Sequence, residues 1–346
     1  MPYRAVLVTG ANGFIARQLI VHLLNKGYRV RGTLRTMERA ADLKRILAPL
    51  APVRALSFCA ADLMNDEGWD EAMKDMDAVF HLASPSPYDT GDRAELIKPA
   101  VEGSVRVLDA ARRAGVTRAI VTSSIAAVAY GHGSADRVSP FSESDWTNLK
   151  SHAIGAFHES KTRAELAVWD FAMKYPDMQI TTINPGAVFG PLIGGDVSTT
   201  PAVIKELMNG EITGLPQVGF EGVDVRDVAD LHERCLRNDL SIGNRYLATA
   251  GFIWLRDVVE VLRRDFASYA TRITTRHIPD FAVRLAALFD RKASLAVPEL
   301  NLYTPCSMAR ACADLGWHPR PAVEAIRETA RSLIAAGVLT PEPEMA

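Results

Sequence analysis

Short apolar segments alternate with amphipathic ones through the first half of this chain. Apolar runs of strand length lie at about 4–9, 28–34, 53–59, 78–83, 118–123 and 179–184. Helical spacing of apolar residues lies between them, at about 14–26, 38–48, 67–75, 93–114 and 152–175. This order predicts βαβ units, and therefore an α/β fold in which a doubly wound parallel sheet of the Rossmann type has helices on both faces.

The alternation stops after Asn184. Glycine and proline crowd the segment 185–195, which predicts an irregular loop. Less regular helices and short strands follow, and they predict a smaller C-terminal substrate-binding lobe. We expect residues 1–185, together with about 221–252, to form the Rossmann domain, and about 186–220 and 253–346 to form the lobe.

Composition narrows the classes of partner. The 346 residues include 39 Lys and Arg and 41 Asp and Glu, with the two signs interspersed, so neither nucleic acid nor a membrane surface is an expected partner. No apolar run reaches the roughly 18 residues that span a bilayer, and no apolar targeting segment precedes the first expected strand. The four cysteines lack metal-ligand spacing, so we expect ordinary, mostly buried thiols, no metal, and a cytoplasmic location.

The turn between the first expected strand and the first expected helix reads TGANGFIA, residues 9–16. Glycine permits a tight turn and lets backbone N–H groups approach a ligand, while the helix N-terminus faces a phosphate with partial positive charge. Because this turn opens a βαβ series, it predicts a dinucleotide site rather than an ordinary turn. The residues expected to contact the dinucleotide are Gly10, Asn12, Gly13, Phe14 and Ile15.

The end of the second expected strand distinguishes the two nicotinamide cofactors. An acidic residue there would bind the ribose 2′-hydroxyl of NAD, but this chain reads GTLR at residues 32–35. The guanidinium of Arg35 suits a 2′-phosphate, with help from Arg39 or Lys44. The sequence therefore favours NADP(H) as the cofactor.

Six motifs occur in a fixed order along the chain. They are TGANGFIA, HLASP (81–85), TSS (122–124), SKTRAE (160–165), NPGAVFGP (184–191) and VDVRDVA (223–229). Together they closely resemble the extended short-chain dehydrogenases/reductases. Within that family, the chain looks like the branch of dihydroflavonol-4-reductases, cinnamoyl-CoA reductases and NADPH-dependent aldehyde reductases, and the resemblance extends over essentially the whole sequence.

The resemblance implies roles for individual residues. Ser124 matches the serine that holds the substrate oxygen, and Lys161 matches the lysine of the family's Tyr-x-x-x-Lys motif, which also contacts the cofactor ribose. The other matches are cofactor contacts: Asp62 and Leu63 beside the adenine, Leu82, Ala83 and Ser84 along the dinucleotide cleft, Pro185 and Val188 near the carboxamide, and Thr200 as a cofactor-side hydroxyl.

Phe157 occupies the position of the family's catalytic tyrosine. In the family, the tyrosine hydroxyl gives a proton to the carbonyl oxygen while hydride reaches the carbon, and the lysine one helical turn away lowers the tyrosine pKa. Phe157 keeps the ring and lacks the acid. Successive residues of a helix point about 100° apart, so neither His158 nor Glu159 replaces the hydroxyl at position 157. Tyr130, which is near Ser124 in the sequence, remains a weak substitute.

Three interpretations of Phe157 follow. Because the remaining motifs are intact, we favour a Tyr-to-Phe form of a reductase that was inactivated on purpose. The first alternative is a natural phenylalanine variant, which uses another proton donor or acts as a dinucleotide-binding sensor. The second is a chain unrelated to redox chemistry. For the function as a whole, an enzyme that resembles 3β-hydroxysteroid dehydrogenases is a further alternative.

The expected reaction is NADPH-dependent reduction of a medium-sized ketone or aldehyde, with alcohol oxidation as its reverse. Plant dihydroflavonol reductases have Asn or Asp where this chain has Ala129, so a flavonoid substrate is not expected. Both a monomer and a homodimer fit the sequence. A partly apolar substrate cap is expected in segment 192–222. Some of its apolar residues must belong to the core of the lobe instead, and the sequence does not separate the two groups: Ile193, Leu207, Met208, Leu215, Pro216, Val218 and Phe220.

Overall fold

The computed structural model describes residues 3–85, 93–132, 139–195, 197 and 199–339. Its main sheet has seven strands in the order β3-β2-β1-β4-β5-β6-β9, and all neighbouring pairs are parallel. The strand order reverses between β1 and β4, which is where doubly wound sheets bind ligands. The strands are β1 (Ala5–Val8), β2 (Arg29–Leu34), β3 (Leu56–Ala60), β4 (Ala78–His81), β5 (Arg118–Thr122), β6 (Gln179–Pro185) and β9 (Arg245–Ala248).

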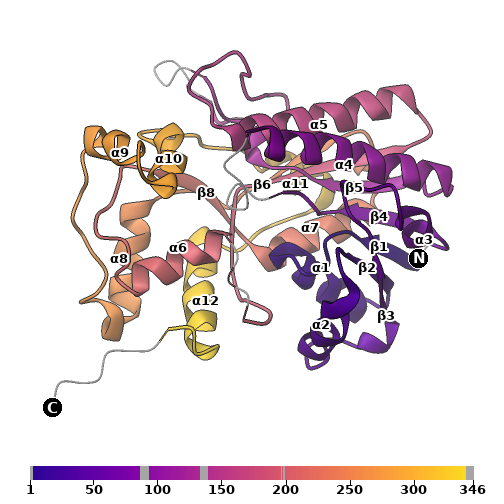
Figure 1. The fold of residues 1–346 in the computed structure, drawn as a ribbon, viewed down its shortest axis with the longest axis horizontal. Helices are drawn as coiled ribbons and strands as arrows, with labels where there is room; N and C mark the ends of the chain where they lie inside the picture. Colours follow the sequence, from indigo (N-terminus) through magenta and orange to yellow (C-terminus); the bar gives the residue numbers. More distant parts are fainter. Residues whose placement is uncertain (1–2, 86–92, 133–138, 196, 198, 340–346) are drawn as a thin grey trace.

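Helices cover both faces of this sheet (Figure 1). One apolar core joins the sheet to α1 (Phe14–Asn25), α2 (Ala40–Leu47), α7 (Val225–Arg237) and α11 (Ala309–Leu315). A second core joins the opposite face to α3 (Trp69–Met73), α4 (Arg93–Arg113) and α5 (Ala156–Lys174). Central strands such as β1 and β4 are buried along their whole length, which explains why they are continuous apolar runs in the sequence.

A three-stranded sheet forms the centre of the smaller part of the molecule, in the order β10-β8-β7. Its strands are β7 (Ala187–Phe189), β8 (Gly219–Asp224) and β10 (Phe252–Trp254). A third core joins it to α6 (Thr199–Met208), α8 (Leu255–Asp265) and α12 (Ala322–Ala335). The smaller part also contains α9 (Asp280–Ala286) and α10 (Arg291–Ala296), which lie on its side away from β3 (Figure 1). No described helix is both long and apolar enough to cross a bilayer.

The predicted α/β fold with a Rossmann-type parallel sheet is confirmed. Two predicted boundaries differ from the structure by three or more residues. Val53–Ala55 is a 3₁₀ turn closed by the N–H of Ala55 on the Pro52 carbonyl, so β3 starts later than predicted. The helix predicted from residue 152 begins at Ala156, because Gly155 before it has an extended backbone (φ −81°, ψ 166°).

The four cysteines are free thiols. We expected most of them to be buried, but only Cys235 is. The other three, Cys59, Cys306 and Cys312, are partly exposed. Cys59 and Cys306 lie at the margins of cores rather than inside them.

Candidate active site

The backbone at Gly10 makes the first turn a cradle. Gly10 has a φ of +66°, a left-handed conformation, and a Cβ at this position would lie 3.1 Å from the Cα of Ala83. Its N–H donates to Oγ1 of Thr33 at 3.0 Å. No side chain caps α1, which begins at Phe14 after Gly13. The start of the helix therefore offers uncapped N–H groups to an anion.

Thr9 fastens the segment after β4 to this turn. Its Oγ1 accepts the N–H groups of Leu82 and Ala83, both at 2.9 Å. The same hydroxyl lies 3.0 Å from Nδ1 of His81, a core histidine whose pKa burial lowers to about 3. Segment 82–84, predicted to line the dinucleotide cleft, is thus held against the glycine turn.

Other residues predicted to contact the cofactor follow the carboxyl ends of neighbouring strands. Arg35 follows β2 and is exposed, and its side chain has no hydrogen-bond or ion-pair partner within the described residues. Asp62 and Leu63 follow β3, where Leu63 packs against α4 at Gly103. Thr200 lies apart in α6, and in the part of the chain that the structure describes no hydrogen bond links it to the rest of the set.

Ser124 and Pro185 meet where β5 and β6 end. The Ser124 Oγ accepts the N–H of Ala126 at 3.1 Å and donates to the Pro185 carbonyl at 3.5 Å. Val188 follows in β7 and is buried. The structure therefore brings the Asn-Pro-Gly turn next to the serine.

Lys161 and Phe157 lie one turn apart on α5. The Lys161 Nζ donates to Oγ of Ser84 at 2.9 Å and lies 5.7 Å from the centroid of the Phe157 ring. Burial lowers the pKa of Lys161 to about 8. The ammonium thus lies between the segment after β4 and the position where the family has its phenol.

Tyr130, the substitute acid that the sequence left open, has other partners. It belongs to the same apolar cluster as Phe157, but its ring lies tilted against that of His158, with centroids 4.0 Å apart, and its hydroxyl bonds to Glu299. Burial, and then Glu299, raise the pKa of Tyr130 well above its ordinary value. His158 also bonds to Glu299, at 2.8 Å, and its Nδ1 accepts the N–H of Gly155. The structure gives no support to either side chain as the missing acid.

Three buried polar residues behind the site were absent from the predicted set. They are Glu165 on α5, Asn184 on β6 and Arg245 on β9, and hydrogen bonds connect them to one another and to the strand end before Ser124. The available signal was spacing, since Glu165 follows Lys161 by four positions and so lies on the same helical face. Asn184 and Arg245 come from distant strands, and their meeting depends on the sheet order.

In segment 192–222, the structure shows which apolar residues belong to the core of the smaller part. Leu207, Met208 and Leu215 are at most 5% exposed and belong to the third core, so they stabilise the smaller part rather than form a pocket wall. The carbonyl of Ile193 accepts a hydrogen bond from Arg17 on α1, at 2.7 Å, which holds this loop against the glycine turn.

Glu221 on β8 is a buried carboxyl under the Asn-Pro-Gly turn. Its side chain is almost inaccessible, and its backbone lies so near Gly186 that a Cβ there would be 2.2 Å from the Glu221 carbonyl oxygen. Its Oε1 accepts the N–H of Cys306 at 2.7 Å. Burial nevertheless raises the pKa of Glu221 from 4.5 to about 7.

We expect Glu221→Gln to remove a pH dependence of stability. Because folding raises the pKa, proton binding stabilises the folded state fully below about pH 4.5, and this stabilisation disappears as pH rises through about 7. The difference in unfolding free energy between variant and parent should therefore shift in favour of the variant by about 3 kcal/mol from pH 4 to pH 8. Urea unfolding at several pH values measures it. Glu102→Gln, an exposed position on α4, is the control and should show no such shift.

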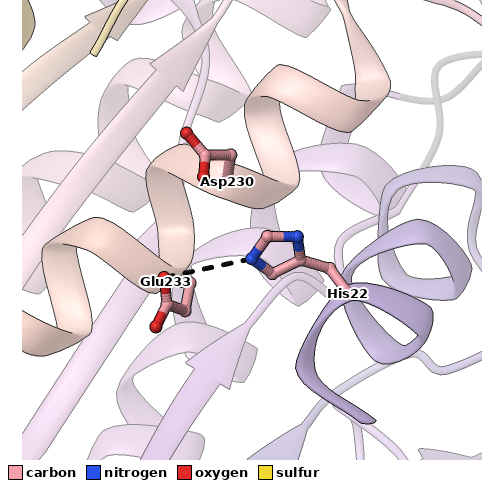
Figure 2. A group of neighbouring side chains, drawn as sticks. All are labelled: His22, Asp230 and Glu233. Carbon is pink, nitrogen blue, oxygen red and sulfur yellow. Dashed lines mark ion pairs between the residues drawn. The ribbon is translucent and has the colours of Figure 1, made fainter. Parts of the chain in front are cut away.

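His22, Asp230 and Glu233 form a second polar group between α1 and α7 (Figure 2). Their potential ligand atoms lie within 4.8 Å of one another, and His22 Nε2 is 4.0 Å from a Glu233 oxygen. Arg234 already pairs with Asp230 at 2.6 Å, and Arg237 pairs with Glu233 at 3.4 Å. Since both carboxylates have cationic partners, the group fits a polar helix–helix contact better than a metal centre.

Comparisons with known proteins agree with this geometry. Cinnamoyl-CoA reductase CAD2 of Medicago truncatula is 34% identical over 268 residues, which cover 76% of this chain and 81% of that protein. The NADPH-dependent methylglyoxal reductase GRE2 of Saccharomyces cerevisiae is 30% identical over 282 residues, or 76% of this chain and 82% of that protein.

Solved structures and a family model extend the comparison to the whole fold. The yeast methylglyoxal/isovaleraldehyde reductase Gre2, solved in complex with NADPH, matches with a TM-score of 0.81 at 27% identity, covering 97% of this chain and 100% of that one. The model described as the NAD dependent epimerase/dehydratase family matches residues 6–247. The chain therefore belongs to the NAD dependent epimerase/dehydratase family, within the extended short-chain dehydrogenases/reductases that its motifs resemble.

Proposed function

We propose that this protein is an NADP(H)-dependent reductase of a medium-sized ketone or aldehyde in which Phe157 replaces the proton-donating tyrosine. The observation that carries the proposal is the meeting of the reaction residues with the glycine turn. Lys161 bonds to Ser84 at 2.9 Å, and the segment of Ser84 lies against Gly10. Ser124 lies at the neighbouring strand end, beside Pro185.

The cofactor site fits a dinucleotide on its own geometry. A Cβ at Gly10 would fill the cradle, no side chain caps α1, and Arg35 has no partner among the described residues. We assign cofactor binding to residues 1–185 with about 221–252, and substrate binding to the rest. The cofactor contacts in this assignment are Gly10, Asn12, Gly13, Phe14, Ile15, Arg35, Asp62, Leu63, Leu82, Ala83, Ser84, Lys161, Pro185, Val188 and Thr200.

Relatives support the reaction class. The GRE2 enzyme is named an NADPH-dependent methylglyoxal reductase, and the Medicago enzyme a cinnamoyl-CoA reductase, so both act on a carbonyl carbon. Ala129 and the apolar cluster around Phe157 suit a substrate of moderate size with an apolar body.

The residues of this chain divide the work of carbonyl reduction. A bound nicotinamide would supply the hydride. Ser124 would donate a hydrogen bond to the carbonyl oxygen as it gains charge, and Lys161 would hold the ribose and provide a positive charge near that oxygen. The proton itself has no donor at position 157, since phenylalanine has no ionisable group. Turnover by the chain as it stands should therefore be slow.

Arg35→Ala tests the choice of cofactor. Removing the guanidinium should weaken NADPH binding about 10- to 100-fold, because a charged hydrogen-bonding partner of the 2′-phosphate is lost. NADH, which lacks that phosphate, should bind almost as before. Fluorescence titration of the nicotinamide measures both affinities. Arg29→Ala, an exposed arginine at the opposite end of β2, should leave both unchanged; equal loss for NADPH and NADH in Arg35→Ala would overturn the assignment.

Turnover tests the reaction itself. NADPH oxidation is followed with aldehydes and ketones, and NAD reduction with steroid alcohols, for the chain as it stands and for Phe157→Tyr. Tight NADPH binding without turnover in either form would favour a dinucleotide sensor. Turnover confined to steroid alcohols with NAD would favour an enzyme that resembles 3β-hydroxysteroid dehydrogenases.

A further inference from the structure

Glu165 is a fully buried carboxylate one helical turn beyond Lys161 on α5. A lone buried carboxylate is costly, and this one is satisfied by donors from three other elements. Both oxygens are used, so little freedom remains for the side chain. The donors are Ser123 Oγ at 2.6 Å, Thr182 Oγ1 at 2.9 Å, Asn184 Nδ2 at 2.6 Å and Arg245 Nε at 2.7 Å.

Arg245 fixes this carboxylate from the side of β9. Its side chain is only 8% exposed, and its NH1 donates to the carbonyls of Glu143 and Asp145 at 2.8 and 2.7 Å. Its guanidinium also lies 3.7 Å from the centroid of the Trp146 ring. The charge of Glu165 is thus balanced by an arginine that is itself held at several points.

Asn184 carries the restraint to the reaction serine. Its side-chain amide donates to Glu165 Oε2 at 2.6 Å and to the main-chain carbonyl of Ser124 at 3.1 Å. The neighbouring Ser123 binds the same Glu165 oxygen through its hydroxyl. Two adjacent residues at the end of β5 are therefore tied to one carboxylate on the helix that carries Lys161.

We infer that Glu165 is a positioning residue for the proposed reduction: through Asn184 and Ser123 it sets the distance between Ser124 and Lys161. The inference rests on the proposed function for its effect on rate. Catalytic groups must keep their geometry within about 0.5 Å, and a shift of about 1 Å costs roughly 100-fold in rate. Two hydrogen bonds through Asn184 thus join α5 to the Ser124 main chain, and Thr162 of α5 adds a longer one, of 3.5 Å, to the carbonyl of Ala126.

The kinetic test uses Phe157→Tyr as the background, with the best carbonyl substrate found for it. Adding Glu165→Gln keeps the shape of the side chain but puts an N–H₂ group where only acceptors fit. We expect kcat to fall 10- to 100-fold while KM for NADPH changes less than threefold, because the glycine turn is untouched. Glu165→Asp keeps the charge and should recover part of the loss.

Asp227→Asn is the matched control. Asp227 is also a buried carboxylate in an ion pair, with Arg320, but it lies on α7 on the other face of the sheet. If both variants lower kcat equally, or if Glu165→Gln raises KM for NADPH alone, the inference is wrong. If Glu165→Gln does not fold, the double variant Glu165→Gln, Arg245→Met takes its place in the assay, because it removes both charges of the buried pair rather than leaving one unpaired.

Crystal structures decide the inference even if Phe157→Tyr shows no turnover. Absence of turnover in Phe157→Tyr itself would contradict the proposed function alone. In Glu165→Gln, the Ser124 Oγ should move relative to Lys161 Nζ by about 1 Å, the scale at which positioning fails. An unmoved serine would overturn the positioning role whatever the enzyme's activity.

Discussion

Phe157→Tyr is expected to raise carbonyl-reductase turnover by about 100- to 10,000-fold. The ring of Phe157 already lies in an apolar cluster with its centroid 5.7 Å from the Lys161 ammonium. Adding one oxygen at the end of this ring gives the site a phenol near a positive charge, which favours the phenolate and lowers the phenol pKa. That is the acid that the reduction lacks.

The measurement is NADPH oxidation at saturating cofactor, with NADPH affinity determined in parallel. Affinity should change little, because residue 157 is not among the predicted cofactor contacts. Phe157→Leu serves as the control, since it alters the same position without supplying a hydroxyl, and it should show no gain. If the parent chain already turns over as fast as Phe157→Tyr, its proton comes from another group. The proposal that Phe157 replaces the proton donor would then be wrong.

The fold was predictable because its signals are local. β1 and β4 are buried on both faces, so each strand appears in the sequence as an apolar run. The turn after β1 needs a left-handed backbone conformation at Gly10, which explains the glycine there. Boundaries were harder where one residue decides them. The start of α5 depends on the extended backbone of Gly155. Helix propensity averaged over many residues does not locate such a boundary to within a few positions.

The site was predictable only in part. The family resemblance implied Ser124 and Lys161, and the structure brings both to the same edge of the sheet. The buried polar residues behind them, Glu165, Asn184 and Arg245, were not predicted. They are far apart in the sequence, and they come into contact only because β6 and β9 are neighbouring strands of the sheet. Core residues such as Leu207 and Leu215 could not be separated from pocket residues, since a lobe core and a pocket wall have the same apolar pattern.

Lys161→Met in the Phe157→Tyr background is expected to cancel most of the restored activity, by about 100- to 1,000-fold. Without the ammonium, a phenol returns toward its ordinary pKa of about 10 and exchanges its proton poorly at neutral pH. The methionine keeps the length of the apolar stem, so packing around Ser84 and Phe157 changes little. Since the lysine is also a predicted ribose contact, NADPH affinity should fall as well, and kcat must be compared at saturating cofactor.

The pH profile distinguishes this electrostatic role from simple packing. Burial lowers the pKa of Lys161 to about 8, so its ammonium is present below pH 8 and lost above it. In Phe157→Tyr, kcat should therefore fall as pH rises through about 8, and this limb of the profile should vanish in the variant that also carries Lys161→Met. Lys161→Arg keeps a charge at all accessible pH values and should move the limb upward. A profile that falls at the same pH in all three forms would show that another group titrates, and that the charge of Lys161 does not control the reaction.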